Sequence, residues 1–185
     1  SKVSDKLAAW NVREADFPIA GSVSDQLKFL LNYAVLAPSG PNTQPWKFLI
    51  KDNEVSLIAD FSRALPSLDP SDRTLYISHG CVLTNLLLAA EHFGFGYDVL
   101  CLPDGISGDR TATVQFSKKA SSPRLPDLFG EIIRRHTNRK SFEKRAIEGE
   151  KLQKLKDCVN RDGFRLDILT SDEDKAGMAE LLARS

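Results

Sequence analysis

The sequence predicts an α+β fold, because segments with helical periodicity alternate with short strand-like runs along the whole chain. Leu27, Leu30, Leu31, Ala34 and Val35 recur at helical spacing. Two runs with strand character follow, joined by a turn signal, and a long apolar helix comes next. With 185 residues, 42% of them hydrophobic, the chain can bury the core of one domain or slightly more.

The first half is expected to hold a helix and then a hairpin. The helix spans residues 25–36, with Ser22 or Ser24 available as its N-cap. Two strands, 46–50 and 55–59, are separated by an Asp-Asn turn signal, which predicts an antiparallel pair within one sheet.

The longest helix is expected over residues 73–93, ended by Gly94 and Gly96. Its many Leu, Ala and Val residues leave little polar surface, which favours extensive burial. The remaining elements are predicted as strands 97–102 and 111–116, helices 128–135, 149–160 and 172–184, and a last strand 163–169.

Composition excludes several classes of partner and site. Lys+Arg and Asp+Glu are equal at 25 each, so no overall basic field attracts nucleic acid or a membrane surface. No apolar run approaches the roughly 18 residues of a spanning helix. The three cysteines are far apart and odd in number, and the three histidines lack ligand spacing, so neither a disulfide framework nor a metal site is predicted. We expect a cytoplasmic protein.

The most informative segment is the proline-rich loop, residues 37–46, with the sequence A-P-S-G-P-N-T-Q-P-W. Three prolines and a glycine restrict its conformation, so Ser39, Asn42 and Gln44 are displayed in few arrangements, as in a binding loop. The alternative interpretation is a helix-to-strand connector anchored by its tryptophan.

A second segment, the basic string of residues 134–139, reads R-R-H-T-N-R. Arginines offer planar, bidentate donors suited to phosphate, and a threonine hydroxyl adds a neutral donor. Arg135, Thr137 and Arg139 are therefore candidates for holding a phosphate group. Taken alone, such a cluster is also typical of a solvated helix end or of surface salt bridges.

The proline-rich loop resembles the A-P-S-x-x-N-x-Q-P-W segment of the nitroreductase family of FMN-dependent oxidoreductases. The resemblance implies that Ser39, Gly40 and Asn42 contact FMN, which in the family is bound largely by the other subunit of a homodimer, and Gln44 is counted with them. Gly40 stands where a second serine is commoner, which leaves only its backbone N–H to contribute. The basic string resembles the family's R-x-S-x-R/K segment, which implies phosphate contacts from Arg135, Thr137 and Arg139.

The two segments occur in the reverse of the family's usual order, which suggests an internal duplication. Residues 1–120 are interpreted as a first nitroreductase-like unit, 121–127 as a connector, and 128–185 as the incomplete beginning of a second unit. This arrangement is similar to that of the Acg-type branch of the family. The strings L-P-S-L-D-P-S-D-R at 65–73 and L-P-D at 102–104 also resemble segments of that branch. The chain therefore looks like the N-terminal part of a longer protein.

The resemblance implies a nitroreductase-like mixed sheet flanked by helices and an FMN-dependent enzyme that takes electrons from NAD(P)H. Small acceptors such as nitroaromatics or quinones would be reduced by two-step exchange. No catalytic side chain is expected, because the flavin carries the chemistry. Self-association is expected, as a homodimer or as an intramolecular pseudo-dimer. Two alternatives remain: a flavin-binding or flavin-sequestering protein without efficient turnover, and a decayed interaction module.

Overall fold

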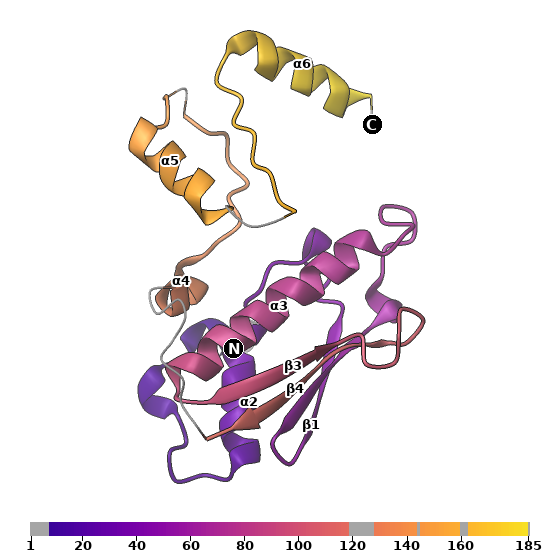
Figure 1. Cartoon of the computed structure of the whole chain (residues 1–185), viewed down its shortest axis with the longest axis vertical. Helices are drawn as coiled ribbons and strands as arrows, with labels where there is room; N and C mark the ends of the chain where they lie inside the picture. The colour runs from indigo at the N-terminus through magenta and orange to yellow at the C-terminus, as the bar shows by residue number, and fades with distance from the viewer. Residues whose placement is uncertain (1–7, 119–127, 144, 160–162, 185) are drawn as a thin grey trace. The chain divides into compact units, whose positions relative to one another are not determined.

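The computed structural model describes residues 8–118, 128–143, 145–159 and 163–184. The chain divides into two compact units, Ser1–Asn138 and Arg139–Ser185, and most of their helices and strands are labelled in Figure 1. The predicted connector, 121–127, lies outside the described residues. The predicted duplication boundaries therefore stay a prediction.

Helix α2 (Val23–Ala34) opens the main part of the first unit and begins two residues earlier than predicted. Its N-cap is Ser22 and not Ser24: the Ser22 hydroxyl accepts from the Asp25 N–H at 3.2 Å, and the Asp25 carboxylate accepts from the Ser22 N–H. This capping box satisfies amide groups that the first helical turn leaves free. The helix buries Leu27, Leu30 and its carboxyl-terminal residues.

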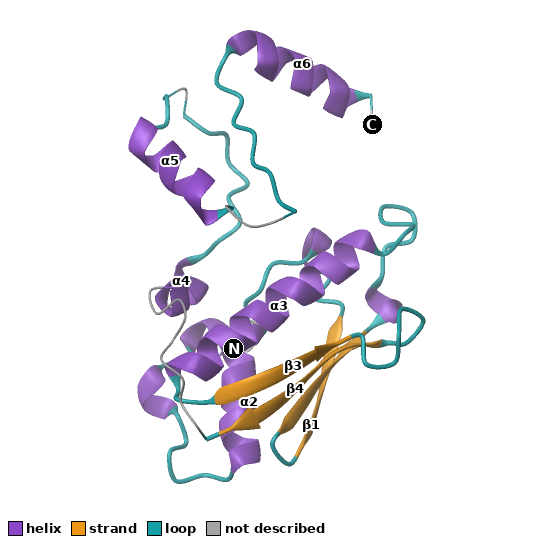
Figure 2. Cartoon of the chain, viewed as in Figure 1, coloured by secondary structure: helices purple, strands orange, loops and turns teal. Residues whose placement is uncertain are grey.

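The four strands of the first unit form one sheet in the order β1-β2-β4-β3 (Figure 2). The strands are β1 (Trp46–Lys51), β2 (Glu54–Ala59), β3 (Gly96–Cys101) and β4 (Arg110–Ser117). Every neighbouring pair among the described strands is antiparallel, so the expectation of a mixed sheet was wrong for this part of the chain. The physical reason is that β4 inserts between β2 and β3, which run in the same direction and are joined by a helical crossover.

That crossover is helix α3 (Arg73–His92), which lies within one residue of its predicted bounds. It packs against α2 and touches three strands of the sheet. Its buried face, with Val82 and Leu86, meets Leu57 and Val114 of the sheet in a single apolar core. Helix α4 (Phe129–Arg134) is one residue shorter at each end than predicted and adds Phe129 to this core. Short 3-10 turns complete the unit at Ala8–Asn11, Glu14–Asp16, Gly40–Asn42 and Phe61–Arg63.

The second unit contains helices α5 (Gly149–Cys158) and α6 (Asp172–Ala183), close to their predicted bounds. Neither helix has a buried residue. The predicted strand at 163–169 was wrong, because these residues form no ladder. A strand needs a partner for its backbone N–H and C=O groups, and the described part of this unit offers none.

None of the described helices is long and apolar enough to cross a membrane. Within the described residues there is also no group of three or more His, Cys, Asp or Glu side chains arranged to hold a metal ion.

Candidate functional site

The proline-rich loop leaves α2 and enters β1 through an unusual backbone path. Asn42 and Gln44 have positive φ angles of 60° and 49°, a region that residues other than glycine rarely occupy. Local hydrogen bonds hold this path: the Asn42 N–H donates to the Ser39 carbonyl at 3.0 Å, and the Gln44 N–H donates to the Ser39 hydroxyl oxygen at 2.9 Å. Such conformations persist only when the surroundings impose them, and they concentrate at functional sites.

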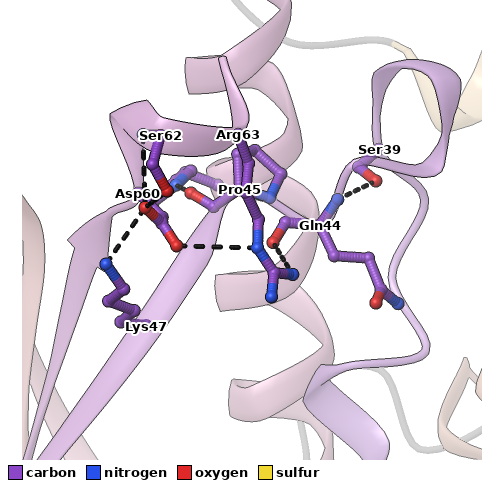
Figure 3. A network of polar contacts seen from close by, with 8 residues as sticks. Ser39, Gln44, Pro45, Lys47, Asp60, Ser62 and Arg63 are labelled. Carbon is purple, nitrogen blue, oxygen red and sulfur yellow. Dashed lines mark hydrogen bonds and ion pairs between the residues drawn. The ribbon is translucent and has the colours of Figure 1, made fainter.

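A buried carboxylate braces the far end of the loop (Figure 3). Asp60 is 6% exposed and lies 3.0 Å from the Lys47 ammonium and 3.6 Å from Arg63 Nε. Hydrogen bonds from Ser62, followed by the Lys47 contact, lower the pKa of Asp60 below its ordinary value. Arg63 also donates from Nη1 to the Gln44 carbonyl at 3.3 Å. The strained residue Gln44 is thereby fixed by a charged group from outside the loop.

The carbonyl of Pro45 is held from two directions. It accepts from the Asp60 N–H at 2.9 Å and from His79 Nε2 at 2.8 Å. Because a carbonyl can only accept, Nε2 carries a proton; Nδ1 lies 2.7 Å from the Thr111 hydroxyl, whose single proton can be donated to Nδ1 or to the Leu57 carbonyl, 3.2 Å away. His79 is 3% exposed, and burial lowers its pKa. Burial thus favours the neutral ring, which ties the loop to α3 and β4.

Gly40 has a steric reason to lack a side chain. A Cβ built at this position would lie 2.6 Å from the Thr74 methyl carbon of α3. The Gly40 N–H donates to the Ser78 hydroxyl oxygen at 3.3 Å. Glycine thus lets the loop backbone approach the first turns of α3, and a serine here would require Thr74 to move.

The proline-rich loop and the basic string meet at the carboxyl end of α2. The Gln44 side chain donates from Nε2 to the Val35 carbonyl at 3.5 Å, and Arg135 donates from Nη2 to the next carbonyl, that of Leu36, at 2.9 Å. The last carbonyls of a helix have no partners within the helix, and cationic donors are favourable there. Two predicted site residues that are 91 positions apart in sequence therefore contact adjacent carbonyls.

The other members of the basic string have different surroundings. Arg134 pairs with Glu131 at 3.1 Å, and the His136 ring stacks on Trp10 with 4.6 Å between centroids. Thr137 is exposed in the first unit. Arg139 is exposed and belongs to the second unit. Within the first unit, Arg135 is therefore the predicted phosphate contact that lies close to the proline-rich loop.

Sequence comparisons identify relatives over most of this chain. It is 27% identical over 150 residues to "Putative NAD(P)H nitroreductase acg" of Mycobacterium tuberculosis, which covers 80% of this chain and 45% of that protein. It is 26% identical over 167 residues to "Probable NAD(P)H nitroreductase PigM" of a Serratia species, covering 85% of this chain and 45% of that protein. The chain is therefore similar, over most of its length, to proteins named as nitroreductases. It spans less than half the length of these relatives.

One of these relatives is Acg itself, so the resemblance to nitroreductases of the Acg type that the sequence indicates is confirmed. No protein-family model matches the chain. Among solved structures, a nitroreductase-like protein of Streptococcus mutans aligns with a TM-score of 0.46 at 17% identity, covering 67% of this chain and 94% of that one.

The residues predicted to contact FMN keep unused donors. The side-chain amide of Asn42 is exposed and has no hydrogen bond with the described residues. The Ser39 hydroxyl accepts from Gln44 but has no acceptor for its own proton among them. Arg135 Nε is buried without a partner in the described part of the chain. These donors, with Thr137, have the chemistry that a phosphorylated flavin requires.

Several structurally important residues were missed by sequence reasoning. Asp60 and Ser62 carried a local signal, since an Asp followed two residues later by Ser is typical of an Asx turn. His79 carried no local sequence signal, because its partners come from distant segments. Asp69 caps the start of α3: its carboxylate accepts from the Leu75 N–H at 3.0 Å. Although burial opposes this, bonds from the first turn of α3 lower the pKa of Asp69.

Proposed function

We propose that this chain is part of an FMN-dependent NAD(P)H oxidoreductase of the nitroreductase type. The enzyme would reduce small acceptors such as nitroaromatics or quinones by two-step exchange. Bound FMN would carry hydride and electrons. The residues of this chain would bind and orient the cofactor, with the Ser39 to Gln44 segment beside the flavin and Arg135, Thr137 and Arg139 at its phosphate.

The observation that carries the proposal is the convergence of Gln44 and Arg135 on the Val35 and Leu36 carbonyls. These residues come from the two segments whose family counterparts build one FMN site. A loop held in a rare conformation by Asp60, Arg63 and His79 supplies the rigidity that a cofactor site needs. The names of the relatives as NAD(P)H nitroreductases support the same class of reaction.

A second candidate function is flavin binding without efficient turnover. Gln44 already donates to Val35, and Arg135 already donates to Leu36. Both side chains therefore stabilise the fold. Such contacts are also compatible with a protein that only holds a flavin, or in which these residues serve the fold itself. Reduction kinetics distinguish this candidate from the enzyme.

The test uses the complete natural polypeptide. Purified protein should contain FMN near one equivalent per polypeptide, because each predicted unit retains a different half of the site, and stopped-flow mixing with NAD(P)H should bleach the flavin absorbance. Bound flavin that NAD(P)H does not reduce would favour the second candidate. A protein that neither contains nor binds flavin would contradict both, and would favour the interaction module.

A further inference from the structure

A small pocket lies on the side of the proline-rich loop that faces α3. Its volume is about 100 Å³. Its apolar walls come from the loop (Pro41, Pro45), from the segment before α3 (Ala64, Leu65, Leu68), and from Leu75. All of these residues belong to the first unit.

The size of the pocket limits its ligand. An engineered protein cavity of about 150 Å³ holds benzene, and drug-sized ligands occupy roughly 300–1,000 Å³. A pocket of about 100 Å³ that opens to solvent can therefore take one ring with part of it left in water. It is too small to hold a flavin ring system.

Most polar groups in the pocket are already satisfied. The Thr43 hydroxyl donates to the Gly40 carbonyl at 3.1 Å. The Ser78 hydroxyl donates to the Thr74 carbonyl at 2.7 Å and accepts from Gly40. The Asp69 carboxylate caps α3, where the amino end of the helix compensates its charge.

Arg63 is the exception. Its guanidinium carries five N–H donors; Nη1 donates to the Gln44 carbonyl, and Nε lies 3.6 Å from Asp60. Its side chain is 54% exposed. Lys47 shares the Asp60 carboxylate, so the cluster of Lys47, Asp60 and Arg63 has a net charge of +1. A free part of a guanidinium fork beside an apolar pocket favours a flat anion.

The rim adds a second observation. Leu68 lines the pocket and yet is 74% exposed. A large apolar side chain at the mouth of an apolar pocket can cover a bound ring. Together with the proline walls, this arrangement suits an aromatic ring better than a small inorganic anion.

We propose that this pocket binds small aromatic carboxylates, with the ring between the loop prolines and Leu68 and the carboxylate on Arg63. The proposal does not depend on flavin binding. Benzoate is the probe, and benzyl alcohol, of similar size but uncharged, is the matched ligand.

The experiment titrates each ligand into the complete polypeptide and follows amide shifts by NMR together with calorimetric binding. Benzoate should saturate, with shifts centred on Thr43, Leu65 and Leu75, and should bind about tenfold more tightly than benzyl alcohol, as expected for one charge-assisted contact. In Arg63→Gln that preference, measured as the ratio of the two affinities, should vanish, so a change in the loop that affects both ligands alike does not alter the result. Arg63→Lys, which keeps the charge without the fork, should retain part of the preference.

Two controls keep the result specific. Ala64→Leu fills the pocket and should abolish binding of both ligands, whereas Ala20→Leu, at an exposed position outside the pocket, should not. Arg13→Gln removes an exposed arginine that pairs with Asp16 and should leave the preference intact. The proposal is overturned if benzoate does not saturate, if Ala64→Leu binds it normally, or if its advantage over benzyl alcohol survives in Arg63→Gln.

Discussion

Helix α3 of the first unit and helix α5 of the second both carry apolar residues at helical spacing, but they bury them to different extents. Leu86 of α3 is 1% exposed, within a core that the sheet and α2 complete. Leu155 of α5 is 51% exposed, and no residue of α5 or α6 is buried. Helical periodicity therefore predicted both helices, but only the first acquires a core among the described residues.

This contrast indicates where the stability of the chain lies. Burying a leucine side chain contributes roughly 1.5–3 kcal/mol, whereas exposed ion pairs such as Lys154 with Glu150 contribute little. The candidate site is built on the first unit, where the strained loop has rigid neighbours. Arg139, a predicted phosphate contact, lies in an exposed segment of the second unit.

The largest expected effect comes from shortening a buried leucine of α3, compared with the same change at an exposed leucine of α5. Leu86→Ala should lower the free energy of unfolding by about 2–5 kcal/mol, because it leaves a cavity in the core. Leu155→Ala, an exposed position, should change it by about 0.5 kcal/mol or less. Urea unfolding of the 185-residue chain, followed by tryptophan fluorescence, measures both. Equal losses would mean that the second unit has a core that contributes to global stability.

The second prediction compares the arginines of the two units in the complete polypeptide. Arg139→Gln should weaken FMN by roughly 1.5–3 kcal/mol and leave riboflavin unchanged, since riboflavin has no phosphate. Arg135→Gln should weaken FMN by a similar amount and should also cause a smaller loss for riboflavin, because the Leu36 carbonyl loses its donor.

Fluorescence titration with each flavin measures these affinities. Identical losses for FMN and riboflavin in both variants would mean that these arginines hold the fold and not the phosphate.

Sequence reasoning was most successful where the determinants are local. Apolar periodicity predicted α3 within one residue at each end, and it predicted α2 within two residues, with Ser22 among the two N-cap candidates. It failed where distant segments decide: the insertion of β4 between β2 and β3 depends on non-local pairing, which no local pattern specifies.

The candidate site shows the same division. The loop and the basic string were recognised as motifs, but the bonds of Gln44 and Arg135 to the end of α2 were not foreseen. His79 was examined only as a metal ligand. Its role depends on Pro45 and Thr111, which are more than 30 residues away on either side. The strand predicted at 163–169 had a suitable pattern but finds no partner strand among the residues that the structure describes.

The third prediction uses the buried histidine of the first unit. Burial lowers the pKa of His79 below its ordinary value of 6.5, so the unfolded chain binds this proton more readily than the folded one. Its contribution to stability is therefore complete above pH 6.5 and is lost as the pH falls through the lower folded pKa, with a slope of at most about 1.4 kcal/mol per pH unit. The pKa values of Asp60 and Asp69 are also lowered, but these two groups lose their contribution to stability only below their ordinary pKa of 3.8.

Urea unfolding of wild type and His79→Gln at several pH values tests this. Glutamine can still donate to the Pro45 carbonyl but does not titrate, so the decline just below pH 6.5 should be reduced in the variant. An unchanged decline would assign it to another group.

The smallest expected effect comes from two equivalent helix caps, one in each unit. The Ser22 hydroxyl accepts from the Asp25 N–H at 3.2 Å, and the Ser171 hydroxyl accepts from the Asp174 N–H at 3.1 Å. Ser22→Ala should cost about 1 kcal/mol of global stability, because α2 is part of the core. Ser171→Ala removes the same bond from α6, a helix without buried residues, and should lower helicity without moving the main urea transition. Far-ultraviolet circular dichroism and tryptophan fluorescence, recorded on the same samples, separate the two responses. If Ser171→Ala shifted the fluorescence transition as much as Ser22→Ala, the two units would unfold together, and the contrast between α3 and α5 would not extend to stability.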